Sequence, residues 1–452
     1  MKQPFSATRN SCKLCMPLGA VMVVKGIALA MPFLHGSQGC STYIRRYMIS
    51  HFRDPVDIAS SNFSESTAVF GGGSNLLAGL RNIITQYNPK LIGIATTCLA
   101  ETIGDDVAGM LRNFEKELGA NGPIIVHIST PSYSGTHEDG FRRAVRAVVE
   151  RVAIRSRNGL LPGNRINVFP ALFSPDDLRY LKDIFFDFGL KAAFLPDYSD
   201  TLDGSAWSEY KLIPKGGIEV DKIKMFPSAK ASITFGAVTA RMGQLTGAAY
   251  LKDSFNVAAH FIASPIGLRA SDGLFELLKG LSGMDTPSRY ADERGRLVDA
   301  YVDGHKYVYG KKAVIYGEED LVVGLASFLS EIGMVPVIVA SGGKSGFLKE
   351  EIARVNLCAH EPQIADDADF ASIAECSRAL KPDIIIGSSK GYGLAKELKV
   401  PLVRVGFPVH DRIGAARILS CGYKGALSLY DSVVNALLDS KQNSSSVGYG
   451  YL

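Results

Sequence analysis

The sequence predicts an α/β fold built from repeated Rossmann-like units with mainly parallel sheets. Short apolar runs of strand length, such as residues 91–96, 312–316 and 335–340, are rich in valine and isoleucine. Helical patterns lie between them, and strands that alternate with helices favour a parallel sheet covered on both faces. At 452 residues the chain exceeds the size at which one hydrophobic core stops growing, so we expect two or three domains.

In the first part of the chain, an apolar segment leads to a glycine-rich turn that ends in Cys40. A helical stretch is then expected to run toward His51, followed by a short strand at residues 57–61. Ser74 follows a run of three glycines and is a plausible N-cap for an amphipathic helix that ends near Tyr87.

The next part repeats a pattern of strand, loop and helix. Ser174 and Pro175 open one of these helices, because serine caps a helix and proline fits its first turn. Residues 197–224 are rich in Ser, Asp, Gly and Lys and hold the only tryptophan, Trp207, so we expect a surface excursion there. Strands are predicted at 91–96, 123–128, 166–170, 192–196 and 258–263, and helices at 105–117, 141–154 and 229–242.

The last part begins near Tyr290 with a long charged helix. Continuous apolar runs and helical patterns then alternate again, as in a doubly wound sheet. Helices are predicted at 292–305 and 321–332, and strands at 312–316, 335–340, 383–386 and 402–405.

Composition excludes several classes of protein. The formal charge is +4 and no basic block stands out, so we expect no nucleic acid partner. The apolar segment 14–34 is interrupted by Pro17, Lys25 and Pro32, which favours a core segment over a membrane span. Residues 1–11 lack the pattern of a secretory signal, so we expect a cytoplasmic protein that binds no membrane.

The cysteines give the first indication of chemistry. Three of them, Cys15, Cys40 and Cys98, lie among glycines and small polar residues, where backbone N–H groups can approach the sulfides of an iron–sulfur cluster. The alternative is that each is a small buried hydrophobic residue. Cys12 and Cys15 form a C-x-x-C pair, but no second pair follows, so a zinc ribbon is disfavoured. Seven cysteines, an odd number, also argue against a disulfide scaffold and favour a reducing compartment.

Two further features near these cysteines have a structural and a chemical interpretation. His35 lies five residues before Cys40 and could be a metal ligand, but we favour a ring that hydrogen-bonds the loop backbone. Asp105 and Asp106 could be paired catalytic carboxylates, but we favour a capping role, because negative charge is stabilised at a helix N-terminus. No serine lies in a context that suggests a Ser-His-Asp triad.

Residues 341–345, Ser-Gly-Gly-Lys-Ser, superficially suggest a phosphate loop. The full motif requires a glycine at position 338, which is an isoleucine within a predicted strand. We therefore expect a loop between a strand and a helix, in a chain that does not hydrolyse ATP itself. Arg294, Arg296 and Asp299 are expected to form a solvated or interface face of their helix.

Several motifs together resemble one known family, the β-type subunit of nitrogenase component 1. The first is His-Gly-Ser-Gln-Gly-Cys-Ser-Thr-Tyr at residues 35–43, and another is Thr-Thr-Cys-Leu-Ala-Glu-Thr-Ile-Gly-Asp-Asp at 96–106. The resemblance extends over nearly the whole chain. Its other segments are residues 51–55, 68–72, 130–137, 293–299, 381–387 and 400–408.

This resemblance implies three Rossmann-like domains, which we place at residues 1–155, 156–290 and 291–452, the first of them binding the cluster. It also implies an α₂β₂ heterotetramer with an α-type partner and a P-type [8Fe-7S] cluster shared between the two kinds of chain. Cys15, Cys40 and Cys98 match the β-side ligands of that cluster. Ser132 matches a serine that can ligate the oxidised cluster.

The resemblance further implies a docking site. Phe70 matches the surface phenylalanine where the ATP-dependent [4Fe-4S] iron protein docks. In such a complex the iron protein hydrolyses ATP, which agrees with a chain that lacks a phosphate loop.

Two departures from the family pattern bear on function. Cys15 lies almost at the start of the sequence, and Cys12 is an addition. They favour a nitrogenase-like branch such as the methylthio-alkane reductases, which cleave C–S bonds, over N₂ reduction by molybdenum nitrogenase. The rival interpretations are a non-catalytic cofactor assembly scaffold and a metal-free α/β binding protein. The family's scaffold subunit keeps only the first of the three cysteines, so a chain with all three favours a reductase.

Overall fold

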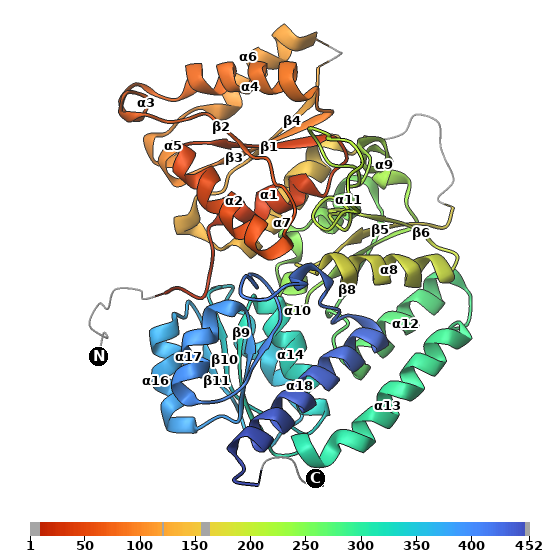
Figure 1. Cartoon of the computed structure of the whole chain (residues 1–452). Coiled ribbons are helices and arrows are strands. Elements are labelled where there is room, and N and C mark those ends of the chain that lie inside the picture. The colour runs from red at the N-terminus through yellow and green to blue at the C-terminus, as the bar shows by residue number, and fades with distance from the viewer. Residues whose placement is uncertain (1–9, 120–121, 155–162, 448–452) are drawn as a thin grey trace. The chain divides into compact units, whose positions relative to one another are not determined.

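A computed structural model describes residues 10–119, 122–154 and 163–447 (Figure 1). The fold contains three parallel sheets, which confirms the predicted α/β class. By its contacts the chain divides into two compact units. One unit holds Cys15–Ile262 and Gly414–Arg417, with the first two sheets, and the other holds the remaining described residues, with the third sheet.

The first sheet has the strand order β2-β1-β3-β4, with every neighbouring pair parallel. Figure 1 shows helices on both of its faces. Its strands are β1 (Ala30–His35), β2 (Ala59–Ser60), β3 (Leu91–Thr96) and β4 (Ile124–Ile128), and its helices are α1 (Met16–Lys25), α2 (Gln38–Phe52), α3 (Glu65–Phe70), α4 (Gly73–Tyr87), α5 (Cys98–Ile103), α6 (Val107–Leu118) and α7 (His137–Val152), with a 3₁₀ turn η2 (Ser132–Ser134).

The second sheet has the order β6-β5-β7-β8 and is also parallel. Ser174 caps its first helix in a capping box, as predicted. Its elements are β5 (Arg165–Phe169), α8 (Pro175–Asp187), β6 (Lys191–Phe194), α9 (Val220–Lys224), η3 (Phe226–Ser228), β7 (Ala231–Phe235), α10 (Ala237–Arg241), η4 (Gly243–Leu245), α11 (Gly247–Phe255) and β8 (Ala258–Ile262).

The third sheet, in the other unit, has the order β11-β10-β9-β12-β13, that of a doubly wound fold. Its elements are α12 (Leu268–Ser282), α13 (Ser288–Val308), β9 (Lys312–Gly317), α14 (Glu319–Glu331), β10 (Val335–Ser341), α15 (Leu348–Val355), β11 (Gln363–Ala365), α16 (Phe370–Leu380), β12 (Ile384–Gly387), η5 (Ser389–Gly391), α17 (Tyr392–Leu398), β13 (Leu402–Arg404) and α18 (Gly422–Ser444). The residues of η6 (Ala415–Arg417) belong to the first unit.

The described strands of the three sheets fall within the predicted ranges 1–155, 156–290 and 291–452, one sheet in each range. The boundaries of those ranges stay a prediction. Among the described residues, no helix is long and apolar enough to cross a membrane.

Two predicted elements were wrong. Ser74 lies inside α4, whose N-cap is Gly72, and a separate helix, α3, precedes it. Residues 229–242 are not one helix but the buried strand β7 followed by the short helix α10, because Gly236 at φ 121° breaks the chain direction between them. The isoleucine, threonine and phenylalanine of β7 pack between neighbouring strands, which favours a strand over a helix.

Helices cover the first sheet on both faces, and they pack differently on each face. On one face, a cluster of buried residues including Phe33, Ile94, Leu80 and Phe114 joins the strands to α4 and α6. On the other face lie α1 and α7, which cross at two glycines. A Cβ atom at Gly19 would lie 1.8 Å from the His137 carbonyl oxygen, so these two helices approach each other backbone to backbone.

Lys25 ends α1 as a buried lysine, only 4% exposed. Burial lowers the pKa of Lys25 to about 8, and the nearby Asp57 only partly opposes this. At pH 7 the ammonium is therefore charged at a cost to the folded state. The stability of the wild-type protein should rise as the pH increases from about 8 toward the unfolded pKa, because the folded state then binds fewer protons than the unfolded state.

We expect Lys25→Met to raise the melting temperature at pH 7, through a gain on the order of 2 kcal/mol from removing the buried charge. The gain should shrink between pH 8 and 10, where wild-type Lys25 loses its proton. Thermal unfolding across this pH range measures the effect. Lys116→Met, on the exposed side of α6, is the control and should change little. A gain independent of pH would contradict the explanation.

The crossing of α1 and α7 gives a second expectation. In Gly140→Ala, the added methyl group would lie 1.9 Å from the carbonyl oxygen of Met16, so the helices must separate. Overpacking of this kind typically costs about 1–3 kcal/mol. Gly295→Ala is the matched control, because a Cβ atom there meets nothing within 4 Å and alanine favours a helix. Denaturant unfolding of both variants checks this, and equal stability of the two would refute it.

Candidate functional site

The three cysteines singled out by the sequence each lie in the first turn of a helix. Cys15 is the N-cap of α1, Cys40 is the third residue of α2, and Cys98 is the first residue of α5. The N–H groups of a first turn have no partner within the helix, and they favour negative charge such as a thiolate or sulfide. All three are free cysteines of intermediate exposure. Three helix starts therefore offer three partly accessible thiols.

Sheet topology brings two of these cysteines together. β1 and β3 are parallel neighbours, and they lead into α2 and α5 at the same edge of the sheet. Thr97, just before Cys98, donates hydrogen bonds from its N–H and its hydroxyl to the carbonyl oxygen of His35, both at 3.1 Å. The loop of Cys98 is thereby tied to the strand that leads to Cys40.

Ser132 links the third cysteine to this edge. It follows β4, the next strand of the sheet, and its N–H group donates a 3.2 Å hydrogen bond to Sγ of Cys98. Its hydroxyl oxygen accepts a 3.1 Å hydrogen bond from the N–H of Met16, the residue after Cys15. Ser132 thus connects the start of α1 to the start of α5.

The pKa values of the thiols show that they influence one another. Burial raises the pKa of Cys15, which the hydrogen bond from Ser132 lowers and the charge of Cys98 raises. Burial also raises the pKa of Cys40, and the charges of Cys15 and Cys98 add to that effect. Burial and neighbouring charge thus disfavour the thiolate forms of Cys15 and Cys40, and a bound cation would favour them.

The donor set suits an iron–sulfur group better than one metal ion. Within the part of the chain that the structure describes, no three side chains of His, Cys, Asp or Glu are placed to hold a single ion. Thiolates are the usual ligands of iron–sulfur clusters, and a cluster spans more space than one ion. The residues present fit one side of such a group: Cys15, Cys40 and Cys98 would be its ligands, with Ser132 beside them.

Large apolar side chains are exposed close in the sequence to three of these residues, Cys40, Cys98 and Ser132. Tyr43 follows Cys40 and is 37% exposed, Leu99 follows Cys98 and is 38% exposed, and Tyr133 follows Ser132 and is 69% exposed. Large apolar side chains exposed on a surface are typical of sites where another protein binds.

His35 is buried, and its ring binds side chains rather than the loop backbone that we predicted. Its Nε2 lies 3.0 Å from Oδ2 of Asp105, and its Nδ1 lies 3.1 Å from the hydroxyl oxygen of Ser61. Both ring nitrogens are engaged, so the second interpretation, a metal ligand, finds no support here.

The two aspartates have different roles. Asp106 caps α6 by accepting a 2.8 Å hydrogen bond from the N–H of Gly109, as predicted. Asp105 does not cap a helix. Its carboxylate accepts hydrogen bonds from the N–H of Gly72 at 3.0 and 3.2 Å and faces His35. Sequence reasoning missed this role, because an acidic pair before a helix looks like a cap whichever residue makes it.

Phe70 is the last residue of α3 and is 87% exposed, beside Val69, which is 75% exposed. The chain then turns at Gly71 with φ 89° and reaches α4 through Gly72. A phenylalanine this exposed gains nothing from the fold, so its surface is available to a partner.

Cys12 lies in the other unit and does not behave like Cys15. Its N–H donates to the carbonyl oxygen of Ala368 at 3.0 Å, and its side chain packs against the core of the third sheet. Burial raises the pKa of Cys12 to about 12, and backbone hydrogen bonds from Gly342 and Gly317 lower it only in part. This thiol is held as a core residue.

Residues 341–345 form the predicted loop between a strand and a helix, β10 and α15. The Ser341 hydroxyl oxygen accepts a 3.0 Å hydrogen bond from Gly343 N–H, and Ser345 donates a 2.7 Å hydrogen bond to Glu319. A carboxylate held in this loop repels phosphate. On α13, Arg294 pairs with Asp272 at 2.9 Å, and Arg296 and Asp299 are exposed, so the predicted solvated face is confirmed.

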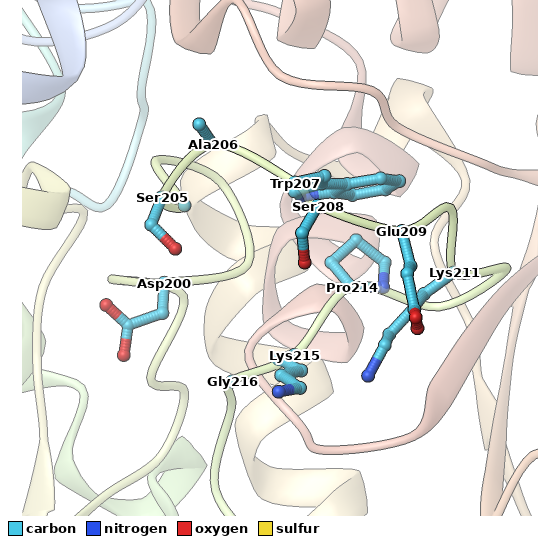
Figure 2. A pocket seen from close by; sticks show the side chains of 11 residues that line it. Asp200, Ser205, Ala206, Trp207, Ser208, Glu209, Lys211, Pro214, Lys215 and Gly216 are labelled. Atoms are coloured by element: carbon cyan, nitrogen blue, oxygen red, sulfur yellow. The ribbon is translucent and has the colours of Figure 1, made fainter.

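The surface excursion at residues 197–224 borders a pocket of about 540 Å³ that is open to solvent (Figure 2). Trp207 lies over it and is 43% exposed. Acidic and basic side chains, including Asp200, Glu209 and Lys211, share the lining. None of the candidate cysteines lines it, so this pocket is separate from the cysteine site.

Comparisons with known proteins test the family. The profile of the nitrogenase component 1 type oxidoreductase family matches residues 15–438. The nitrogenase molybdenum-iron protein beta chain of Clostridium pasteurianum is 33% identical over 434 residues, covering 95% of this chain and 93% of the relative. That of Methanococcus maripaludis is 34% identical over 457 residues, covering 97% and 96%.

An assembly protein and a solved structure are also similar to this chain. The nitrogenase iron-molybdenum cofactor biosynthesis protein NifN of Bradyrhizobium diazoefficiens is 33% identical over 432 residues, covering 95% of this chain and 89% of the relative. The solved structure of nitrogenase Cp1 at pH 6.5 superposes with a TM-score of 0.93 at 30% identity, covering 100% of this chain and 98% of the other. The chain therefore belongs to the nitrogenase component 1 family of oxidoreductases, as a β-type subunit.

Proposed function

We propose that this chain is the β subunit of a nitrogenase-like reductase that holds one side of a P-type [8Fe-7S] cluster. Cys15, Cys40 and Cys98 bind the cluster, and an α-type partner in an α₂β₂ heterotetramer supplies the other ligands. The observation that carries the proposal is that three partly exposed thiols, each at a helix start, lie close enough for their charges to influence one another.

The chain's residues supply the surroundings that such a cluster requires. When bound, the cluster supplies reversible one-electron transfer, which side chains alone do not provide. First-turn N–H groups stabilise its negative charge. Ser132, bonded to Sγ of Cys98 and to Met16, holds two ligand segments in register and lies within reach as a further ligand. The exposed Tyr43, Leu99 and Tyr133 give the partner an apolar surface to cover.

Electrons are proposed to reach this cluster from an ATP-dependent [4Fe-4S] iron protein that docks at Phe70. Two facts support the division of labour. Phe70 and Val69 form an exposed apolar tip, and residues 341–345 hold a carboxylate where a phosphate loop would need positive charge. From the cluster the electrons pass to a metallocluster in the α-type partner.

The substrate follows from the partner's metallocluster. Reductive C–S bond cleavage, as in methylthio-alkane reductases, is the branch that we favour over N₂ reduction, because Cys12 departs from the pattern of the molybdenum enzyme. The assay for this branch is hydrocarbon release from a methylthio-alkane, with N₂ reduction by the same complex as the comparison.

A second candidate is a non-catalytic scaffold for cofactor assembly. Its support is the similarity to NifN, which at 33% identity equals that to the Clostridium beta chain. The presence of all three cysteines favours the reductase. Iron counting and EPR spectroscopy on the purified complex distinguish the two functions. An eight-iron interface cluster indicates the reductase, and a four-iron cluster indicates the scaffold. Colourless protein purified without oxygen would contradict both.

Removing one ligand tests the cluster directly. In the complex purified with its partner, we expect Cys98→Ala to lose the cluster iron and the reductase-dependent turnover, because a shared cluster that loses a thiolate assembles poorly. Cys376→Ala, at an exposed cysteine of the other unit, should keep both. Iron content and the EPR spectrum are the measurements, and full iron content in Cys98→Ala would overturn the proposal.

Removing the apolar tip tests the docking site. We expect Phe70→Ala to raise the reductase concentration needed for half-maximal turnover by about 10- to 30-fold, the effect of losing an interface anchor worth about 2 kcal/mol. Iron content should stay unchanged, because Phe70 is 87% exposed. Phe186→Ala is the matched control, a phenylalanine on α8 that is 78% exposed in the same unit. Equal titration curves for the two variants would exclude docking at Phe70.

A further inference from the structure

A buried pair, Asp105 and His35, lies between the exposed tip at Phe70 and the segments that carry two of the cysteines. The Asp105 carboxylate accepts hydrogen bonds from Gly72 N–H at 3.0 and 3.2 Å and lies 3.0 Å from Nε2 of His35. The side chains of His35 and Asp105 are 0% and 6% exposed. Hydrogen bonds to a carboxylate shielded from water are among the strongest in proteins.

On the side of the tip, the two residues after Phe70 are fitted around this carboxylate. A Cβ atom at Gly72 would lie 2.3 Å from the ring of Phe63 and 2.8 Å from Oδ2 of Asp105. Gly71 has φ 89°, a conformation that favours glycine. The tip therefore rests on Asp105 through a turn that has no room for side chains.

On the side of the cysteines, His35 joins both ligand segments. Its carbonyl oxygen accepts two hydrogen bonds from Thr97, the residue before Cys98. Its Nδ1 faces the hydroxyl oxygen of Ser61, which also accepts a 2.9 Å hydrogen bond from the N–H of Gly36, at the start of the loop that leads to Cys40. One histidine thus contacts the approach to Cys98 and the approach to Cys40.

The network is satisfied by a neutral imidazole. Burial lowers the pKa of His35, while Asp105 raises it. In the neutral form with its proton on Nε2, the ring donates to Asp105 and accepts from the Ser61 hydroxyl, which still accepts from Gly36. Each polar group of the path then has a partner, as a rigid buried network requires.

We propose that Asp105 and His35 are positioning residues that fix the docking tip, residues 70–72, to the segments bearing Cys40 and Cys98. The surface that receives the reductase and two of the cluster ligands are thereby held at one spacing. This inference rests on the proposed function, since it assigns a docked reductase and a bound cluster to the two ends of the path.

Asp105→Asn is the variant that breaks this path without changing side-chain volume. Oδ2 of Asp105 accepts from Gly72 N–H and lies 3.0 Å from Nε2 of His35, while Oδ1 lies 3.2 Å from the same Gly72 N–H. An amide that keeps its oxygen at the Oδ2 place therefore loses the negative charge that strengthens both contacts and turns its NH₂ group toward the N–H of Gly72. Asp106→Asn is the matched control, because the neighbouring carboxylate caps α6 through Gly109 and touches neither end of the path. Loss of a helix cap costs a similar free energy to loss of such a hydrogen bond.

Amide hydrogen exchange on the purified complex measures, independently of turnover, whether the segments joined by Asp105 and His35 open together. We expect Asp105→Asn to accelerate amide exchange about tenfold in residues 70–76 and also in 35–42 and 96–100, since opening one end frees the other. Asp106→Asn should accelerate exchange only in 106–112. Acceleration confined to 70–76 in Asp105→Asn would overturn the proposal.

Reductase titration reads the consequence for docking. With iron content unchanged, Asp105→Asn should raise the half-saturating reductase concentration by about five- to tenfold, and Asp106→Asn by less than about twofold. If both variants match in exchange and titration while the wild-type complex carries its cluster, this inference alone fails. If the wild-type complex carries no cluster, the proposed function fails and takes the inference with it.

Discussion

The site depends on one property of a parallel sheet: its strands all end at the same edge. β1, β3 and β4 are neighbours, and the loops after them carry Cys40, Cys98 and Ser132. No side chain has to reach far, because the strand spacing already sets the distance between neighbouring loops. Cys15 is the exception, since it precedes the sheet. Its place is fixed by the crossing of α1 and α7, where two glycines let the backbones touch.

Two opposing electrostatic effects act on the thiols. Burial and mutual repulsion raise the pKa values of Cys15 and Cys40, while the helix starts favour their charged forms. Neither effect alone gives stable thiolates at neutral pH. Iron ions bonded to these sulfurs would favour the thiolate forms, because a bound cation offsets both burial and repulsion.

Much of the fold could be predicted because its signals are local. β3 runs from Leu91 to Thr96, the predicted range, because a short continuous apolar run of this length is typical of a buried strand. The helix predicted at residues 229–242 was wrong because the signal there is not local. The neighbouring strands on both sides of β7 override the helical pattern of the sequence. Ser74 failed as a cap because Gly72, held by Asp105, starts α4 two residues earlier. That hydrogen bond joins positions 33 residues apart, and the local sequence does not show it.

The residues of the candidate site differ in how far the sequence alone could show them. The cysteines and Ser132 were identifiable from motifs, but the path through Asp105 and His35 was not, because it depends on side chains that meet only after β1 and β3 pair.

The crossing of α1 and α7 has a consequence for how the protein is made. Cys15 is among the first described residues, yet the helix that fixes it, α7, ends only at Val152. The first hundred residues of the growing chain hold all three cysteines and both β1 and β3, but not the helix that places Cys15. Pairing segments so far apart carries a large entropic cost until the sheet closes. Any group that binds all three cysteines would therefore be added only after α7 has packed on the first sheet.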